Sequence, residues 1–484
     1  MRRLRHVVLA LVVAVPFVVG PAHAATPPAG AISPGVSFLA NLPELRTAIS
    51  LNFIGATMFA STVTGIYSYD VSDPAKPALL GALPQYIWEN EDVDLDAKRH
   101  LLFLSRDPRG FTTPATTAFP YGAVQVIDVA NPRLMKQLSM TLLPGGHTTT
   151  CVDGCNYTWT AGPASSVTDP KEWGGRPVYA LDMRDPSKPV PCPHPIDTDE
   201  NDGRTDYTHD VQVDSTGIAW ISGSGAVRGY WVTGTHRNAQ TGVVQKATGC
   251  DPVPYAGGGT NLGQLVGRGG VMHNSLRPSY LKNTLIATEE VTGTSDCNAA
   301  GHLAAYDISN TYAGAGFRST PAHKFRMTLL DTWTTEKAVG ANACDSAHYF
   351  TDRGDGLLAA AFYTQGTRFL DVRDPRHIRQ VGFYRPDNAD TWAAYWRPGG
   401  YVFVADFLRG VDILQIGALQ NTVAAPASAR HDLPNTRSAL FGYLCQVPKA
   451  LPLPGAGRGS TGSRTAPDPA EGAKLAVVRG VPGG

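Results

Sequence analysis

Short runs of alternating apolar and polar residues, each closed by a turn, follow one another along most of the chain. The clearest pair comprises residues 208–214 and 218–223, separated by a Ser-Thr-Gly turn. Alternation with a period of two predicts half-buried β-strands. The second strand of each pair is expected to end in a small residue, at Ser61, Ser105, Thr160, Ser222, Thr288, Ala361 and Ala405. The sequence therefore predicts seven repeats.

A recurring phrase, apolar-Asp-apolar-x-Asp/Asn-Pro, ends a strand in several repeats. It stands at residues 69–74, 127–132, 181–186 and 370–375. The Asp or Asn before Pro favours an Asx turn, and Pro fixes φ for the reversal. Four strands in each of seven units predict an all-β fold, a seven-bladed β-propeller.

The two ends of the repeat region are expected to meet in one blade. The last unit has a third strand at residues 410–414 but no convincing fourth, whereas residues 36–43 resemble the fourth strand of the first unit at residues 77–84. An N-terminal strand that completes the last blade removes two open sheet edges. The sequence thus predicts a ring closed by its N-terminal strand.

The Asp-Pro phrase resembles the LVIVD repeat of secreted and cell-surface propellers of bacteria and archaea. The match to that repeat is clearest in residues 66–77. The resemblance covers most of residues 36–417 and implies the architecture. It leaves the activity open, because propellers host many unrelated functions. The fourth unit departs from the repeat, since residues 229–234 stand where the phrase is expected.

The N-terminus is typical of an export signal. Three early arginines precede an apolar stretch and an Ala-His-Ala site, so residues 1–24 are predicted to be a signal peptide cleaved near Ala24. Residues 25–35 form a short linker, residues 36–417 the propeller, and residues 418–450 an extension that packs on the ring or is loosely ordered. The Gly- and Pro-rich residues 451–484 are predicted to be disordered. We expect a secreted protein without membrane insertion, because no later stretch reaches the length of a membrane helix.

The charge balance restricts the class of partner. Lys and Arg equal Asp and Glu at 41 each, and loss of the three signal arginines makes the mature chain slightly acidic. There is no basic surface for nucleic acid. The expected partner is a small molecule, a glycan or an extracellular protein, bound by a monomer.

Seven cysteines in an exported chain predict disulfides with one cysteine left over. The first candidate pair, Cys151 and Cys155, flanks a hairpin turn, for which zinc binding is the alternative interpretation. The other candidate pairs lie in long connections and are Cys192 with Cys250 and Cys297 with Cys344.

Histidines coincide with the phase of the repeat. Counting back thirteen residues from the end of each second strand reaches the start of the innermost strand, which lines the channel. His147, His209 and His348 fall on that count, and His273 falls within two residues of it. In the second unit the same count reaches Asp92, which stands beside Glu91. Imidazoles and carboxylates together suit one transition-metal ion, for which copper and zinc are the candidates.

Further candidate residues are expected at the same mouth. Most of them follow a second strand, whereas Glu91 stands beside Asp92 and Trp392 stands at the channel position of the seventh unit. The possible general bases or metal-supporting groups are Glu91, Glu289 and Glu290, and the possible ligand contacts at the mouth are Arg106, Tyr363, Trp392 and Asp406. The alternative is that the histidines only hydrogen-bond neighbouring blades. A separate acidic loop, residues 197–206, resembles a calcium loop with one residue too many.

Two functions remain open from the sequence. The first is an extracellular binding or interaction module with a metal- or ligand-binding channel. The alternative is a metal-dependent extracellular enzyme of the oxidase or hydrolase type that uses the histidine ring. A histidine-lined channel is similar to that of the selenium-binding protein and methanethiol oxidase group, and this resemblance implies copper. No stretch of the sequence matches that group closely enough to assign its functional residues to positions in this chain.

Overall fold

The computed structural model describes residues 28–84, 90–107, 122–163, 177–196, 198, 208–223, 226–239, 241–259, 271–290, 301–309, 327–336 and 346–419. The predicted signal peptide, the chain beyond residue 419, the pair Cys297 and Cys344, and nearly all of the acidic loop lie outside these residues. Among the described residues, no helix has the length and apolar character needed to cross a membrane.

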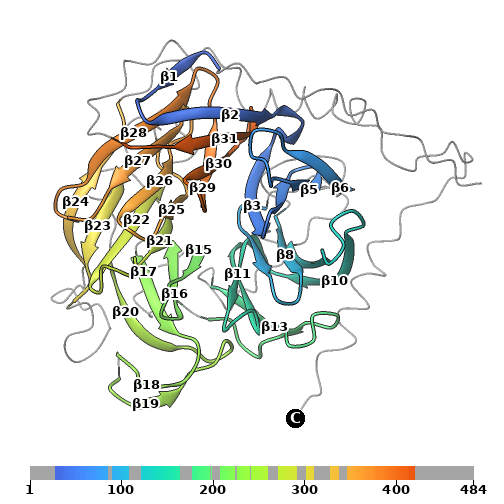
Figure 1. Ribbon diagram of the computed structural model, residues 1–484. Helices are drawn as coiled ribbons and strands as arrows, with labels where there is room; N and C mark the ends of the chain where they lie inside the picture. The colour runs from blue at the N-terminus through green and yellow to red at the C-terminus, as the bar shows by residue number, and fades with distance from the viewer. Residues whose placement is uncertain are drawn as a thin grey trace, which may run out of the picture.

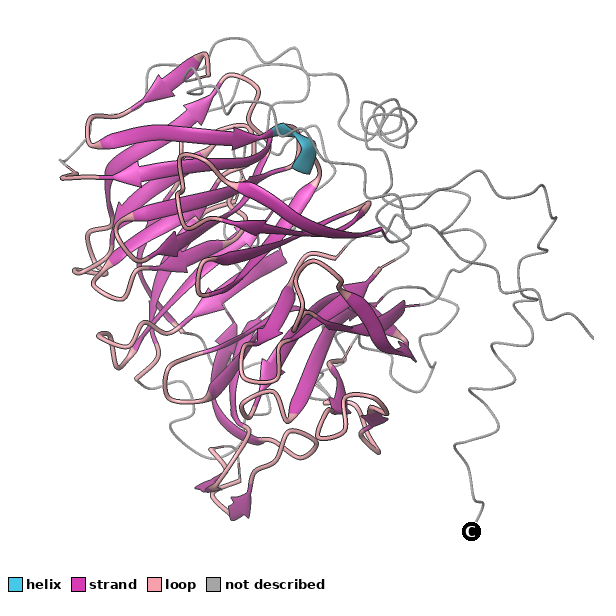
Figure 2. Ribbon diagram, turned by 45° about the vertical axis from the view of Figure 1, so that its right-hand side comes forward, coloured by secondary structure: helices cyan, strands magenta, loops and turns pink. Residues whose placement is uncertain are grey.

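Seven antiparallel sheets stand around a central channel, which confirms the seven-bladed propeller (Figures 1 and 2). Each sheet is a meander that runs outward from its innermost strand. The first three blades are β3 (Ala48–Ile54), β4 (Thr57–Thr62), β5 (Gly65–Asp70) and β6 (Ala78–Pro84); β7 (Val93–Asp96), β8 (Leu101–Arg106), β9 (Gly122–Asp128) and β10 (Lys136–Leu143); and β11 (Gly145–Val152), β12 (Tyr157–Pro163), β13 (Tyr179–Asp182) and β14 (Val190–Pro191).

The next three blades follow the same order, with one added hairpin. They are β15 (Thr208–Val213), β16 (Ile218–Gly223), β17 (Ala226–Trp231) and β20 (Val253–Gly259); β21 (Val271–Leu276), β22 (Thr284–Glu290), β23 (Leu303–Asp307) and β24 (Thr328–Trp333); and β25 (Phe350–Asp352), β26 (Leu357–Ala361), β27 (Thr367–Asp371) and β28 (Arg379–Pro386). The hairpin of β18 (Thr235–Arg237) and β19 (Val244–Lys246) is inserted in blade four. This insertion replaces the Asp-Pro phrase that the sequence lacks there.

The last blade is closed by the N-terminus, as predicted. It consists of β29 (Thr391–Arg397), β30 (Tyr401–Asp406) and β31 (Gly410–Ile416), and β2 (Val36–Leu42) pairs with β31 from Val36 opposite Ile416 to Leu42 opposite Val411. The two strands lie side by side at the top of Figure 1. A 3-10 helix, Pro43–Leu45, connects β2 to blade one. The expected linker also contains a strand that was not predicted, β1 (Gly30–Ile32), which adds a fifth strand to blade six.

The Asp-Pro phrase forms turns that hold the strands of a blade together. Asp73 Oδ1 accepts a hydrogen bond from the backbone N–H of Ala75 at 3.1 Å, the predicted Asx turn. Asp70, three residues earlier, makes a similar turn with the N–H of Ser72 at 2.9 Å. The intervening Val71 is buried, and its N–H donates to the carbonyl of Ala56 at 2.8 Å. The phrase thus pins the third strand to the turn between the first two.

Apolar side chains of adjacent blades pack face to face, and disulfides reinforce two places. Trp159 of blade three, for example, meets Tyr230 of blade four edge-on, with ring centroids 6.3 Å apart. The predicted bonds Cys151–Cys155 and Cys192–Cys250 are present, and the second one ties blade three to blade four. These contacts hold neighbouring blades together around the side chains that line the channel.

The innermost strands carry β-bulges where the histidines stand. In β15 the pairing skips His209, because Thr208 pairs with Gly223 and Asp210 with Ser222. The same skip occurs at His273 in β21 and, over two residues, at Gly146 and His147 in β11. A bulge reorients side chains and breaks the strict alternation of a strand. It therefore allows consecutive residues to face the channel.

Candidate functional site

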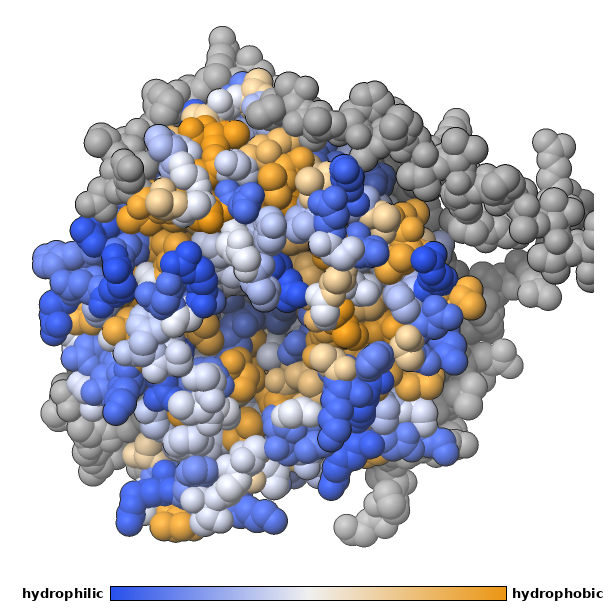
Figure 3. All heavy atoms as spheres, in the orientation of Figure 1, coloured by the Kyte–Doolittle hydropathy of each residue, from blue (hydrophilic) through white to orange (hydrophobic). Residues whose placement is uncertain are grey.

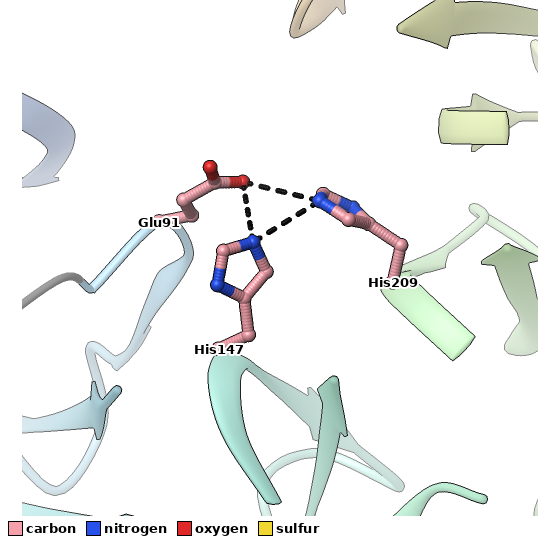
Figure 4. A group of neighbouring side chains, drawn as sticks. All are labelled: Glu91, His147 and His209. Atoms are coloured by element: carbon pink, nitrogen blue, oxygen red, sulfur yellow. Dashed lines mark hydrogen bonds and ion pairs between the residues drawn. The ribbon is translucent and has the colours of Figure 1, made fainter. Parts of the chain in front are cut away.

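The four predicted histidines converge in the channel, and Glu91 joins them. Each comes from, or immediately precedes, the innermost strand of its own blade, from blade two to blade six. All are buried, with fractional exposures of 5% or less except for His147 at 7%. Figure 4 shows Glu91, His147 and His209 pointing toward one another from three different segments. Figure 3 shows that the centre of the ring is hollowed on one face, with both hydrophilic and hydrophobic residues around the hollow.

The Glu91 carboxylate occupies the middle of the cluster. Its Oε2 atom lies 3.2 Å from His147 Nε2, 3.5 Å from His209 Nε2 and 3.3 Å from His273 Nε2; His348 Nε2 lies 3.8 Å from Oε1. The Nε2 atoms of His147 and His209 are 3.1 Å apart. Among the described residues, Glu91 Oε2 and both ring nitrogens of His273 have no partner with hydrogen-bond geometry.

Three of the four rings are held through Nδ1. His147 Nδ1 lies 2.9 Å from Asp107 Oδ2, His209 Nδ1 lies 3.3 Å from the carbonyl oxygen of His273, and His348 Nδ1 lies 2.7 Å from that of Trp392. An acceptor at Nδ1 favours the proton on that nitrogen, which puts the lone pair used in metal binding on Nε2. The fold thus directs Nε2 atoms into the cluster.

The electrostatics favour neutral imidazoles at His209 and His273 and an ionised Glu91 carboxylate. At His348, by contrast, burial is outweighed by the hydrogen bond and charge of Glu91, which raise its pKa. Burial, aided by the charge of neighbouring imidazoles, holds the pKa of His209 well below its ordinary value and lowers that of His273 to about 3. Burial opposes the negative charge of Glu91, but His147 and the other imidazoles hold its pKa well below the usual range. Metal ions bind these same deprotonated forms.

The spacing of three ligand atoms matches the face of a metal tetrahedron. Metal–nitrogen bonds of about 2.0–2.1 Å at tetrahedral angles place the ligand atoms about 3.3 Å apart. Glu91, His147 and His209 have separations of 3.1, 3.2 and 3.5 Å. Two further triads, Glu91 with His273 and His348 and His209 with His273 and Glu290, also have their ligand atoms within 4.8 Å of one another. This buried cluster can therefore hold a metal ion.

The two candidate glutamates at the end of β22, Glu289 and Glu290, point in different directions, because neighbouring side chains of a strand face opposite sides of the sheet. Glu290 Oε2 lies 3.9 Å from His273 Nε2, and the Tyr363 hydroxyl donates a hydrogen bond to its other oxygen. Burial raises the pKa of Glu290 to about 7. Glu289 instead faces His302, and its Oε2 atom lies 3.6 Å from His302 Nδ1. Of the two, only Glu290 borders the cluster.

The other three residues expected at the mouth, Arg106, Trp392 and Asp406, make contacts outside the histidine cluster or reach it only through the backbone. Arg106 directs its guanidinium toward the sulfur of Met140 on the outer strand β10, at 3.1 Å. Trp392 contributes its backbone carbonyl to His348, with the two rings 5.0 Å apart. Asp406 accepts from the N–H of Asp390 at 2.9 Å and from the hydroxyl of Thr391 at 3.0 Å. Asp406 thus braces blade seven.

Sequence reasoning placed Asp92 in the position that Glu91 occupies, and it missed Asp107. Asp92 lies one residue further along the channel, where it bridges Thr148 of the neighbouring blade. Asp107 follows β8 directly, one residue beyond Arg106. The only signal for Asp107 in the sequence was that it is a carboxylate shortly after the end of a second strand. Several other residues have the same signal, so it could not single out Asp107.

Comparison with known proteins gives distant structural neighbours only. No family model and no curated protein matches the chain. The β-propeller domain of Myceliophteria thermophila Cps50 (Swd1) has 9% sequence identity and a TM-score of 0.49, over 79% of this chain and 99% of that domain. The WD40 β-propeller domain of Doa1 has 9% identity and a TM-score of 0.47, over 79% and 97%.

Proposed function

We propose that the protein is an exported propeller that binds one transition-metal ion in its channel. The observation that carries the proposal is the convergence of four Nε2 atoms on Glu91, with three of the rings fixed through Nδ1. Imidazole and carboxylate ligands suit copper and zinc. The LVIVD-like repeats, the signal-like N-terminus and the two disulfides support a role outside the cytoplasm.

The bound ion would be held first by Glu91, His147 and His209, whose atoms already have tetrahedral separations. His273 supplies the next nitrogen, 3.3 Å from the same carboxylate oxygen. Such an ion would make the channel a binding module for a small molecule that coordinates metal.

A metal-dependent enzyme is the second candidate, and one observation favours it. The Tyr363 hydroxyl and the Glu290 carboxylate form a hydrogen-bonded pair beside the metal ligands, and burial raises the pKa of Glu290 to about 7. A carboxyl group that titrates near neutrality can accept or donate a proton next to a metal-bound ligand. Glu290 would be the general base or acid, and Tyr363 the residue that positions it.

The test is the metal content of the purified mature chain, residues 25–484, after exposure to copper and to zinc. We expect about one ion per chain, and loss of that ion when His147 and His209 are both changed to alanine. His236→Ala is the matched control, because this histidine lies on the exposed hairpin and stacks on Trp231. A folded wild-type chain that retains neither metal would remove the proposal.

A further inference from the structure

A second layer of polar side chains lies in the channel beside the histidine cluster. Each residue that follows a member of the cluster in sequence is polar and belongs to an innermost strand or its start. These residues are Asp92, Thr148, Asp210, Asn274 and Tyr349. The bulges at His209 and His273 let consecutive residues share the channel. The proposed transition-metal site uses none of this second layer.

The layer joins two carboxylates through shared donors. Gln212 Nε2 lies 3.1 Å from Asp210 Oδ2 and 3.5 Å from Asp92 Oδ2, so one amide group spans both acids. Asn274 Nδ2 donates to Asp210 Oδ2 at 3.1 Å. The Thr150 hydroxyl lies 3.1 Å from Asp92 Oδ2 but also 2.6 Å from the carbonyl of Val211, and its one proton serves only one of them. These donors all reach the Oδ2 atoms of the two acids.

Several oxygen atoms at this place have no partner. Among the described residues, Asp210 Oδ1, Asn274 Oδ1 and the Tyr349 hydroxyl are buried and make no hydrogen bond. The fractional exposures of these three residues are 0%, 2% and 6%. The Tyr349 ring packs against His273 and His348, with ring centroids 4.6 and 5.0 Å apart, so it lies beside the cluster and next to Asn274. Unpartnered buried oxygens cost free energy unless a ligand satisfies them.

We propose a second ion site in the channel, which binds a divalent cation of the calcium type through oxygen ligands. Its residues are Asp92, Asp210, Asn274 and Tyr349, and the Gln212 side chain, whose amide nitrogen now spans the two acids, borders it. Carboxylates with amide carbonyls are the ligands of hard cations, whereas the imidazoles of the neighbouring cluster select transition metals. Asp92 and Gln212 are only half-buried, so the site opens on the channel.

Calcium titration of the metal-free mature chain, followed by calorimetry and by terbium luminescence, tests the site. We expect saturable binding of one ion and at least a tenfold weaker affinity in the Asp92→Asn/Asp210→Asn double variant. Asn274→Ser, which keeps both carboxylates, should weaken binding less and guards against misfolding of the double variant. Asp199→Asn in the acidic loop is the control for calcium bound there, and it should leave the affinity unchanged.

The outcomes separate this site from the transition-metal site. His147→Ala/His209→Ala should lose copper and zinc but keep calcium, and the aspartate variants should do the reverse. No saturable binding of calcium, magnesium or manganese by the folded wild type would overturn the proposal. Equal calcium affinity in the wild type and in the aspartate double variant would overturn it as well.

Discussion

Asp107 should control the metal affinity of the cluster without touching the ion. It is fully buried, and its Oδ2 atom lies 2.9 Å from His147 Nδ1, on the side of the ring opposite Nε2. A carboxylate in this place fixes the ring and makes Nε2 a better donor of electrons to a metal. Asp107→Asn keeps the size of the side chain and removes its charge.

The expected loss follows from that contact. Partners of this kind change metal affinity by about 10–100-fold, equivalent to about 1.4–2.8 kcal/mol of binding free energy. Zinc affinity is measured by competition with a chromophoric chelator, and folding by circular dichroism. Asp406→Asn is the matched control, because Asp406 is equally buried at the end of a second strand but accepts its hydrogen bonds from blade seven.

Two results would refute this reasoning. Wild-type zinc affinity in folded Asp107→Asn would show that the His147 ring needs no acceptor or is no ligand. An equal loss in Asp107→Asn and Asp406→Asn would show that any buried acid in these blades affects the channel through general stability.

Three further predictions concern stability. Because burial lowers the pKa of His273 to about 3, the unfolded chain binds a proton there between pH 6.5 and 3 that the folded chain does not, so acidification lowers the free energy of unfolding. Urea unfolding of the metal-free chain at pH 7 and 5 should show this loss reduced in His273→Gln, by at most about 1.4 kcal/mol per pH unit, and equal slopes would contradict it. The Ser105 hydroxyl lies within hydrogen-bond distance of the carbonyls of Asp92 and His147, so Ser105→Ala should cost about 1–3 kcal/mol in the same assay, and an unchanged midpoint would count against that role. Deletion of residues 25–42 removes β2 and should prevent cooperative thermal unfolding, whereas deletion of residues 25–33 removes only β1 and should lower Tm slightly; similar Tm values for the two deletions would argue against closure by β2.

The fold could be predicted from local patterns because propeller blades are built from neighbours in sequence. Alternation, the Asp-Pro turns and the small residues at second-strand ends are all local signals. The small residues have a physical cause in several blades: the Ser61 hydroxyl, for example, lies 3.4 Å from the carbonyl of Ser50, next to a bulge in the innermost strand. The strand β1 carries no such signal and was missed.

The site was only partly predictable because its details depend on pairing between strands. Counting residues found the four histidines, but the count assumed regular strands and gave Asp92 the place of Glu91. The bulge at His209 exists only in the register between β15 and β16, so a period of two did not show that His209 and Asp210 share the channel. The same limit left Glu289 and Glu290 undistinguished.

Anomalous X-ray diffraction from crystals of the mature protein grown with zinc tests the central claim most directly. The account predicts one strong peak at the zinc edge, about 2 Å from Nε2 of His147 and of His209 and from a carboxylate oxygen of Glu91. A channel without a peak at these atoms, in crystals that show the four histidines in place, would contradict it.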